Sequence, residues 1–434
     1  MKQKADKTLY ALVDCNNFYV SCERVFRPDL WYKPVAVLSN NDGCIVARSA
    51  EVRALGIKMA TPLHQVQHLI KRHKVHLFSS NYALYADMSQ RVMHCLEQFA
   101  PDVELYSIDE SFLDLSGLQW LDLTEYALEL KKTVQQYTGI PVCVGIGPTK
   151  TLAKLANYAA KKWPKTNGVL DLSDSVRRKK LMRLTPVNEI WGIGRRTAKR
   201  LAIMGILTAA DLARQPAERI QGQFNIVIAR IVLELNGISC LSLEEVAPKQ
   251  QIVCSRSFKP RLSDHAKLAE ALASFCSRAA EKLRQQQSIA GSITVFIQTN
   301  PFNPDEPQYQ RSTHIQLQQP CQDTRHIVSI AKQLLKSIYK EGYRYQKCGV
   351  ILGNIRAAVQ PQQLDLFQLV ELQEADKNQS EQKLMNTIDS INKRFPKSIT
   401  ASASNLYNHW QYSVKHLSGR HTTNWHELPL VKCQ

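Results

Sequence analysis

Ser107-Ile108-Asp109-Glu110-Ser111 is the stretch of this sequence that most strongly constrains the fold, together with Leu12-Val13-Asp14 near the start. Two separated apolar segments here deliver acidic residues at their ends, which is how a fold assembles a carboxylate cluster that holds two divalent cations. A single acid at the end of a strand is often only a turn or helix cap. The three acids Asp14, Asp109 and Glu110 together favour a metal site.

The surroundings of these acids support that interpretation. Seven acidic residues and no Lys or Arg lie between Pro101 and Glu125, although the whole chain has a formal net charge of +18. An acidic patch within a basic protein needs a local reason. Two-metal phosphoryl transfer supplies one, because it uses carboxylates to hold the ions that activate a hydroxyl and steady a leaving phosphate.

The composition indicates several domains and a polyanionic partner. A chain of 434 residues suggests roughly three or four domains. Lys and Arg outnumber Asp and Glu by 56 to 38, and residues 140–240 alone carry 17 basic and 6 acidic residues. This excess predicts a nucleic-acid-binding surface, with an anionic membrane surface as the alternative.

The cysteines and the lack of long apolar runs indicate the compartment. The 11 cysteines are odd in number, and none falls into a CxxC pair or a Cys/His pattern with zinc spacing. No apolar run approaches the ~18 residues of a membrane span, and polar residues 1–8 lack the apolar core of a signal peptide. We therefore expect a soluble cytoplasmic protein with reduced thiols and no membrane partner.

Apolar patterning and turn residues predict the elements around the acids. Residues 9–13 predict a buried strand ending at Asp14, and residues 103–106 and 112–115 predict a hairpin with Asp109 and Glu110 at its turn. Side-chain alternation lapses at a turn, so both acids can face one site. Further predicted elements are strands over 35–38 and 44–47 joined across Asn40-Asn41-Asp42-Gly43, a helix over 50–55 that stops at Gly56, and an amphipathic helix over 149–162 with Lys150, Lys154 and Lys161 off its apolar face.

A basic, helix-rich segment follows. The run Arg177-Arg178-Lys179-Lys180 precedes Trp191-Gly192-Ile193-Gly194, which predicts a helix-hairpin-helix whose backbone N–H groups approach a phosphate. A GxG by itself also occurs in many plain turns. The four basic residues just after it favour sequence-independent binding of the DNA backbone: Arg195, Arg196, Lys199 and Arg200.

The last part of the chain divides into an α+β domain and a polar region. Residues 248–355 predict helices over 266–284 and 327–339 with a strand over 292–298. Beyond residue 357 the sequence is Gln-rich, which predicts a linker before a poorly patterned C-terminal region. Within the linker, Gln363-Leu364-Asp365-Leu366-Phe367 is either a docking peptide or a short apolar segment packed on the last domain.

Five stretches carry a resemblance to a known family. They are LVDCNNFYVSCERVF at 12–26, SNNDGCIVARSAEVRALG at 39–56, SSNYALYADM at 79–88, SIDES at 107–111 and GIGPTKTLAKLANYAA at 145–160. Together they resemble the Y-family translesion DNA polymerases, and within them the UmuC-type catalytic subunits of DNA polymerase V and their plasmid-borne relatives. The resemblance extends from about residue 8 to the C-terminus, including 311–353 and 421–432.

The resemblance implies roles for individual residues. Asp14, Asp109 and Glu110 match the family's catalytic, metal-binding carboxylates, with two Mg²⁺ ions as the cofactor. Tyr19, following Phe18, matches the steric gate that packs under the sugar and rejects a ribonucleotide's 2′-hydroxyl. From sequence alone, Tyr19 would be a core aromatic.

The resemblance also implies contacts to the triphosphate and to a sliding clamp. Arg53 and Lys161 match cations on the incoming triphosphate. Ala50 stands where many members have a Tyr, three residues before the Arg, which makes Arg48 a further candidate. The residues Gln363, Leu364, Leu366 and Phe367 resemble the peptide by which bacterial polymerases dock into the clamp, with Leu366 and Phe367 filling an apolar pocket.

The implied fold is an α+β multidomain right hand. It has a mixed-sheet palm over 1–175 with small fingers inserted at about 27–90, a helix-hairpin-helix thumb over 176–246, an α+β little-finger DNA-binding domain over 247–357, a linker with the clamp peptide over 358–370 and a C-terminal UmuC-type region over 371–434.

The implied activity is error-prone, template-directed nucleotidyl transfer past damaged bases, acting in SOS mutagenesis and DNA repair. We expect no proofreading exonuclease, because the sequence has no second carboxylate set of similar quality. Implied partners are primer-template DNA, deoxynucleoside triphosphates, the sliding clamp, a processed UmuD dimer and a RecA filament.

Two other classes of protein remain as alternatives. Nucleotide cyclases and two-metal nucleases also use paired acids on such a sheet, but they leave the basic helices and the clamp peptide unexplained. A catalytically silent DNA-binding accessory protein of the same fold is the second alternative, and the three intact acids argue against it.

Overall fold

The structure, a computed structural model, describes residues 8–244, 248–358, 372–395, 398–399 and 414–428. The described residues form two compact units, one made of residues up to 244 together with 414–428 and the other of residues between 248 and 399. The two units have separate hydrophobic cores. Within the described ranges, no helix combines the length and the apolar character needed to cross a membrane.

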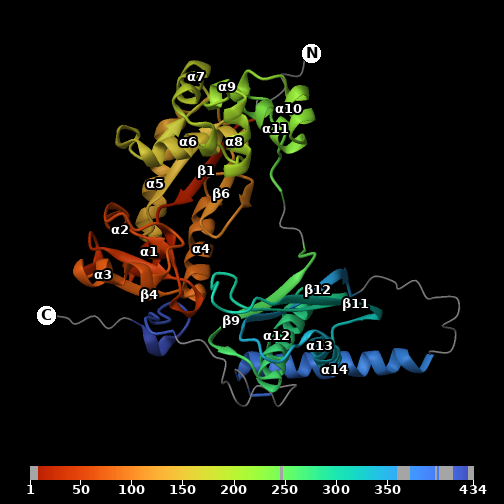
Figure 1. Ribbon diagram of the computed structural model, residues 1–434. Helices are drawn as coiled ribbons and strands as arrows, with labels where there is room; N and C mark the ends of the chain where they lie inside the picture. Colours follow the sequence, from red (N-terminus) through yellow and green to blue (C-terminus); the bar gives the residue numbers. More distant parts are fainter. Residues whose placement is uncertain (1–7, 245–247, 359–371, 396–397, 400–413, 429–434) are drawn as a thin grey trace. The chain divides into compact units, whose positions relative to one another are not determined.

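A five-stranded mixed sheet forms the centre of the first unit (Figure 1). Its order is β5 (Val103–Leu105), β6 (Glu110–Asp114), β1 (Tyr10–Cys15), β7 (Val142–Gly147) and β8 (Val169–Asp171), with β7 and β8 parallel and the other neighbours antiparallel. Ala11 and Val13 share a core with α4 (Tyr82–Leu96) and α5 (Leu123–Thr138). Leu12 lies on the other face, in one apolar cluster with Ala153 of α6 (Lys150–Lys162). Because side chains alternate along a strand, Asp14 belongs to the α6 face.

A smaller three-stranded sheet follows the first helix. α1 (Phe18–Val25) and the 3₁₀ helix η1 (Pro28–Leu30) lead to β2 (Val35–Leu38), β3 (Ile45–Arg48) and β4 (His76–Ser79), in the order β3-β2-β4. The antiparallel β2–β3 pair, joined through η2 (Asn40–Asp42), confirms the predicted hairpin. α2 (Ala50–Ala54) and α3 (Leu63–Arg72) pack on this sheet, and α2 ends before Gly56, whose φ is 78°.

α6 lies very close to β7, because a glycine leaves room for it. A Cβ atom on Gly145 would come within 2.1 Å of the backbone nitrogen of Asn157. Asn157 is buried, and its side-chain amide donates hydrogen bonds to the carbonyls of Leu12 (3.2 Å) and Cys143 (2.9 Å). α6 is thus fixed in both position and rotation against β1 and β7.

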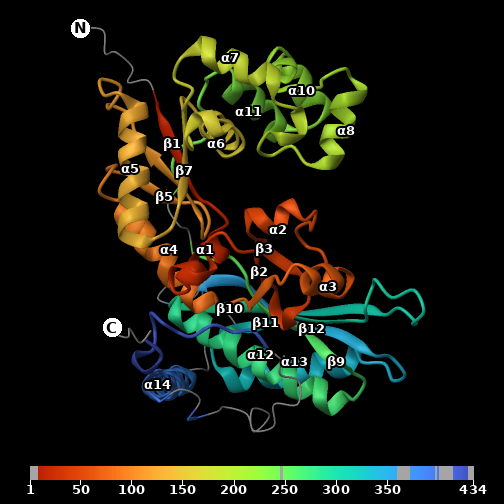
Figure 2. The same cartoon turned by 90° about the vertical axis from the view of Figure 1, so that its left-hand side faces the viewer.

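The opposite side of α6 packs against a helical segment (Figure 2). Its elements are η3 (Pro164–Thr166), α7 (Ser175–Leu184), η4 (Val187–Glu189), α8 (Arg195–Ile203), α9 (Ala209–Ala213), α10 (Ala217–Gln223) and α11 (Ile226–Leu235). The carboxylate of buried Glu234 accepts hydrogen bonds from the backbone N–H groups of Thr151 (3.0 Å) and Cys240 (2.7 Å). α6 therefore connects the five-stranded sheet to this helical segment.

The second unit is a four-stranded antiparallel sheet with helices packed on it. Its order is β11 (Gln310–Cys321), β10 (Ser288–Gln298), β12 (Tyr345–Ala357) and β9 (Ile252–Leu262). α12 (His265–Gln285) and α13 (Thr324–Ile338) lie side by side and share its apolar core (Figures 1 and 2). The prediction of an α+β arrangement for this part of the chain holds.

A long helix, α14 (Leu372–Arg394), also belongs to the second unit. Met385 is buried, and the guanidinium of Arg284 makes two hydrogen bonds to the carboxylate of Asp389, at 2.6 and 2.8 Å. The expectation of a poorly patterned region was wrong for this stretch. Leu384, Met385, Ile388 and Ile391 recur at helical spacing among polar residues.

Residues 414–428, which include η6 (Trp425–Glu427), group with the first unit. The N–H of Ser79 at the end of β4 donates to the His416 carbonyl (2.9 Å), and the His416 N–H donates to Ser79 Oγ (3.1 Å). The described residues of the C-terminal region therefore divide between the two units.

Gly145→Ala should destabilise the first unit, because the added methyl group has no space between β7 and α6. Overpacking of this kind costs typically about 1–3 kcal/mol. Gly222→Ala is the matched control, since nothing lies within 4 Å of its Cβ position and alanine favours the helical conformation of α10. Urea denaturation followed by circular dichroism measures both variants. An unchanged midpoint for Gly145→Ala would contradict the packing described here.

Candidate active site

Asp14 and Glu110 lie directly opposite each other on neighbouring strands. The antiparallel register of β1 and β6 pairs their Cα atoms. Glu110 is the first residue of β6, so the prediction that it lies in the turn was wrong by one position. Glu110 shares its face of the sheet with Phe112, as Asp14 does with Leu12, and both carboxyl groups therefore belong to the α6 side.

Asp109 is held beside this pair by two hydrogen bonds. Its backbone carbonyl accepts from the N–H of Cys15 (2.8 Å), and its Oδ1 accepts from Ser107 Oγ (2.6 Å). The three predicted acids are thus neighbours at the end of β1 and the start of β6.

Lysines of α6 face these acids. Lys154 Nζ lies 2.7 Å from Glu110 Oε2, and Lys161 forms an ion pair with Asp14. Lys150, unlike those two, is buried, and it forms an ion pair with Glu104. The basic side of this helix, predicted to lie off its apolar face, is therefore turned toward carboxylates.

The two opposed carboxyl groups affect each other's ionisation. Burial raises the pKa of the Asp14 carboxyl to about 7, against the opposing effect of Lys161. Burial also acts to raise the pKa of Glu110, but the hydrogen bond from Lys154, with the other nearby cations and donors, outweighs it and lowers that pKa. Close acids need nearby positive charge if both are to stay ionised. Both lysines of α6 act in that direction, and Glu110 is the acid whose pKa ends below its ordinary value.

The same oxygens are chemically suited to a divalent cation. Carboxylates are the hard donors that Mg²⁺ prefers. Among the residues that the structure describes, no group of three or more His, Cys, Asp and Glu side chains is arranged as a ready-made metal cage. Asp14 and Glu110 instead form ion pairs with the ammonium groups of Lys161 and Lys154. The donor set fits the metal, and metal binding there would compete with Lys154 and Lys161.

Tyr19 lies in a stack of aromatic rings beside the acids. Its ring stacks on that of Tyr85, with centroids 4.3 Å apart and planes 14° apart, and it meets the edge of Tyr82 at 6.1 Å. Phe18 is buried in the core of the five-stranded sheet. Of the two residues predicted for the steric gate, Tyr19 is therefore the one with an accessible ring.

The predicted triphosphate cations on the small sheet differ in their surroundings. Arg53 is exposed on α2, one turn after Ala50. Arg48, at the end of β3, donates a hydrogen bond to the carbonyl of Ile57. Burial and the neighbouring Arg53 charge lower the pKa of Arg48. Arg48 is thus partly engaged with the backbone.

The glycine turn of the basic segment lies between the short η4 helix and α8. Gly192 has a φ of 86°, which favours glycine, and exposed Gly194 is the N-cap of α8. Among the basic residues predicted to contact DNA, Arg195, Arg196 and Lys199 are exposed. Arg200 is also exposed, but its guanidinium donates to the Gln223 carbonyl (2.7 Å) and lies over the Phe224 ring. The element before the turn is a single 3₁₀ turn rather than a full helix.

Lys154 and Tyr85 shape this site but were not predicted to belong to it. Lys154 lies seven positions before the predicted Lys161, so the two lysines share a helix side, and that spacing is a signal that could have paired both with the acids. Tyr85 carried no comparable signal, because an aromatic at helical spacing is more often a core residue.

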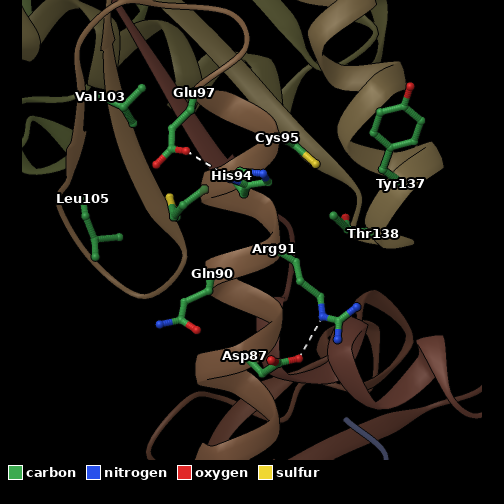
Figure 3. A pocket seen from close by; sticks show the side chains of 11 residues that line it. Asp87, Gln90, Arg91, His94, Cys95, Glu97, Val103, Leu105, Tyr137 and Thr138 are labelled. Atoms are coloured by element: carbon green, nitrogen blue, oxygen red, sulfur yellow. Dashed lines mark hydrogen bonds and ion pairs between the residues drawn. The ribbon is translucent and has the colours of Figure 1, made fainter.

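A pocket of about 740 Å³ lies elsewhere in the first unit, between α4, β5 and the end of α5 (Figure 3). Two interacting pairs of polar side chains line it, Asp87 with Arg91 at 2.8 Å and His94 with Glu97 at 3.1 Å. None of the predicted site residues lines this pocket. The predicted clamp peptide at 363–367 lies outside the described residues.

Models of one family match much of this chain. The impB/mucB/samB family matches residues 13–158, and the C-terminal domain of that family matches residues 249–366. A domain of unknown function, DUF4113, matches residues 382–431.

Relatives match along nearly the whole chain. Protein UmuC of Salmonella typhimurium is 46% identical over 428 residues, which cover 98% of this chain and 100% of that protein. Protein ImpB of Salmonella typhimurium is 44% identical over 430 residues, with coverage of 98% and 100%. Protein MucB of Escherichia coli is 43% identical over 425 residues, with coverage of 98% and 99%.

Solved structures share the fold. A Y-family DNA polymerase chimera of Dbh and Dpo4 has a TM-score of 0.66 at 21% identity, covering 80% of this chain and 99% of that one. An insertion ternary complex of Dbh DNA polymerase has a TM-score of 0.53 at 22% identity, with coverage of 80% and 99%. This likeness confirms the predicted right-hand α+β fold class. The chain therefore belongs to the impB/mucB/samB family, the UmuC-type branch of the Y-family DNA polymerases.

Proposed function

We propose that this chain joins a deoxynucleoside triphosphate to the 3′-hydroxyl of a primer opposite damaged template bases, as an error-prone polymerase of the SOS response. One observation carries the proposal: Asp14 and Glu110 are paired across β1 and β6, with Asp109 beside them. Paired carboxylates of this kind serve two-metal phosphoryl transfer. A family member that keeps all three acids is expected to be active rather than a silent accessory protein.

The acids Asp14, Asp109 and Glu110 would hold two Mg²⁺ ions. When bound, the metal supplies activation of the primer hydroxyl and stabilisation of the leaving phosphate. Before that, Lys154 lowers the pKa of Glu110, and Lys161 opposes the effect of burial on the pKa of Asp14, through their ion pairs. We expect Lys161, once released from Asp14, to pair with the triphosphate, and exposed Arg53 to add a second cation. Arg48 contributes less, because it is bonded to the Ile57 carbonyl.

Asp109→Asn should abolish nucleotide incorporation, because it removes one carboxylate charge from the cluster without changing side-chain size. We expect a loss of at least about 10²–10³-fold, the scale seen when one electrostatic group of an active site is removed. Asp102→Asn is the control, since this exposed acid lies in the same acidic stretch but next to Asp114, at the opposite end of β6 from Glu110.

Single-nucleotide primer extension with Mg²⁺ measures the effect on undamaged and abasic templates. UmuD dimer, RecA and clamp are supplied in parallel. Tight DNA binding without incorporation by the wild-type chain under every condition would instead support the silent accessory protein.

Tyr19 and the rings around it are proposed to select the sugar. A ring that packs under the sugar leaves no space for a 2′-hydroxyl. The stacking of Tyr19 on buried Tyr85 keeps the Tyr19 ring from moving aside. Phe18 supports α1 from the core and does not face the nucleotide in this proposal.

Tyr19→Ala should therefore relax discrimination against ribonucleotides. We expect the ratio of kcat/KM for deoxynucleotide over ribonucleotide to fall by about 10- to 100-fold, the range in which pockets discriminate a single hydroxyl. Tyr137→Ala is the control, because this α5 tyrosine is 66% exposed and does not line the aromatic stack. Equal ratios for wild type and Tyr19→Ala in primer extension would exclude Tyr19 as the gate.

The basic segment is proposed to hold the DNA backbone. Gly192 and Gly194 let backbone N–H groups approach a phosphate, and exposed Arg195, Arg196 and Lys199 supply charge. Arg200 is assigned mainly to holding α8 against α10. In this proposal the palm spans 1–175 with fingers at about 27–90, the thumb 176–246 and the little finger 247–357, followed by the linker at 358–370 and the region at 371–434.

The proposal includes partners and a compartment that rest on the resemblance. The processed UmuD dimer and the RecA filament are expected to bind this chain, and the linker peptide to dock into the sliding clamp. A cytoplasmic location agrees with the ten described cysteines, all of which are free thiols.

Leu366→Ala combined with Phe367→Ala should abolish clamp binding, because the pair fills the apolar pocket in the proposed docking mode. Distributive primer extension without the clamp should stay unchanged. A pull-down with the sliding clamp measures binding, and Gln360→Ala, outside the five-residue peptide, is the control. Unchanged clamp affinity in the double variant would refute docking through this peptide.

A further inference from the structure

The C-terminal segment at 414–428 contacts the first unit where α1, β4 and α4 meet. The N–H of Lys415 donates to Asp42 Oδ2 (2.9 Å), and Asp42 Oδ1 accepts from Ser79 Oγ (2.6 Å). His416 is paired with Ser79 through the two backbone contacts described above. The ring of His421 stacks on Phe26, with centroids 4.9 Å apart. The segment is thus anchored at several points along its length.

Asn81 joins this segment to the start of α4. Its side-chain oxygen accepts from the N–H of Leu84 (3.3 Å) and so caps the helix. Its side-chain nitrogen donates to Ser418 Oγ (3.0 Å) and to the Gly419 carbonyl (3.3 Å). Asn81 is 5% exposed. One buried side chain therefore starts the helix that carries Tyr85 and also binds the C-terminal segment.

Glu23 of α1 completes the connection. Its Oε1 accepts hydrogen bonds from Ser418 Oγ (3.1 Å) and from the Tyr85 hydroxyl (2.7 Å). Glu23 is 2% exposed, and burial raises the pKa of its carboxyl to about 7, against the opposing effect of these two donors. A buried carboxyl of this kind depends on its hydrogen-bond donors, because it has lost its hydration.

These contacts form a chain from the C-terminal segment to the proposed steric gate. Ser418 binds Glu23, Glu23 binds the hydroxyl of Tyr85, and the ring of Tyr85 stacks on Tyr19 at 4.3 Å. We propose that Ser418 and Glu23 are positioning residues for sugar selection, through which the C-terminal segment fixes the aromatic rings under the incoming nucleotide. The inference rests on the proposed role of Tyr19 as the gate. In this inference, residues 414–428 help to position the rings of the nucleotide pocket.

The physical reason is that a tyrosine with a bonded hydroxyl has a defined ring position. Without the Ser418 hydroxyl, Glu23 loses one of its two hydrogen-bond donors. The Glu23 carboxyl is then held less firmly, and so is the Tyr85 hydroxyl that donates to it. Small displacements of a positioning group have large effects on a reacting geometry. Loss of Ser418 should therefore affect discrimination more than turnover of the correct substrate.

Ser418→Ala tests the inference in the full-length chain. We expect the kcat/KM ratio of deoxynucleotide over ribonucleotide to fall by about two- to tenfold, as for the loss of one hydrogen bond to a buried group. The kcat for deoxynucleotide should stay nearly unchanged. Ser418→Thr keeps the hydroxyl and should restore the ratio. Trp425→Ala, on the same segment and 84% exposed, should have no effect.

Tyr19→Ala in the same assay separates two kinds of failure. If Tyr19→Ala leaves the ratio unchanged, the proposed gate is wrong, and the assignment of Ser418 falls with it. If Tyr19→Ala lowers the ratio but Ser418→Ala does not, only the positioning role is wrong. The double variant should be no less selective than Tyr19→Ala alone, because Ser418 acts through the gate.

Amide hydrogen exchange tests the docking without any need for activity. The amides of Lys415 and His416 are bonded to the first unit, so peptides covering 414–421 should exchange more slowly than unstructured chain. Asn81→Asp keeps the oxygen that caps α4 but removes the donor to Ser418, and it should lower this protection. Unprotected 414–421 peptides in the wild-type chain would overturn the inference.

Discussion

The close packing of α6 on β7 is the constraint on which the first unit depends. Because Gly145 has no side chain and Asn157 is bonded to two carbonyls of the sheet, the helix can neither withdraw nor rotate. Its rotation then decides which residues face the acids, and Lys154 and Lys161 do. Its opposite side packs against the helical segment that follows. One helix thus sets the electrostatics of the site and the attachment of the basic region.

This arrangement explains why the acids can be paired at all. Two carboxylates in register on a partly buried face repel each other, and each would lose its charge without nearby cations. Lys154 lowers the pKa of Glu110 and Lys161 opposes the rise at Asp14, but removing a charge pair from water offsets much of its attraction, so these pairs contribute little net stability. We interpret these ion pairs as interactions that occupy the carboxylates until a ligand binds. In the proposed function, a divalent cation would replace the lysines at the carboxylate oxygens and the triphosphate would pair with Lys161, so that no charge is left unpaired.

The strands, the hairpin and the three acids could be predicted because their signals are local: period-two patterning, turn residues and strand ends. The role proposed for Tyr19 rests only on the resemblance, since an aromatic beside Phe18 at the start of a helix looks like any core residue. The bond between Glu23 and Ser418 could not be predicted, because the two residues are 395 positions apart and no local pattern links them. A buried acid on α1 also contradicts the usual expectation that Glu faces solvent.

The attachment of residues 414–428 differs in kind from the rest of the first unit. The apolar cores of the described residues include no side chain from this segment, and its contacts are hydrogen bonds to Asp42, Ser79, Asn81 and Glu23, with one ring stack on Phe26. Hydrogen bonds are directional, whereas apolar burial is not. The segment therefore adds orientation rather than bulk stability, and the group whose orientation it fixes is the Tyr85 hydroxyl. The aromatic stack thus depends on contacts with the C-terminal segment, whereas the acids depend on β1, β6 and α6.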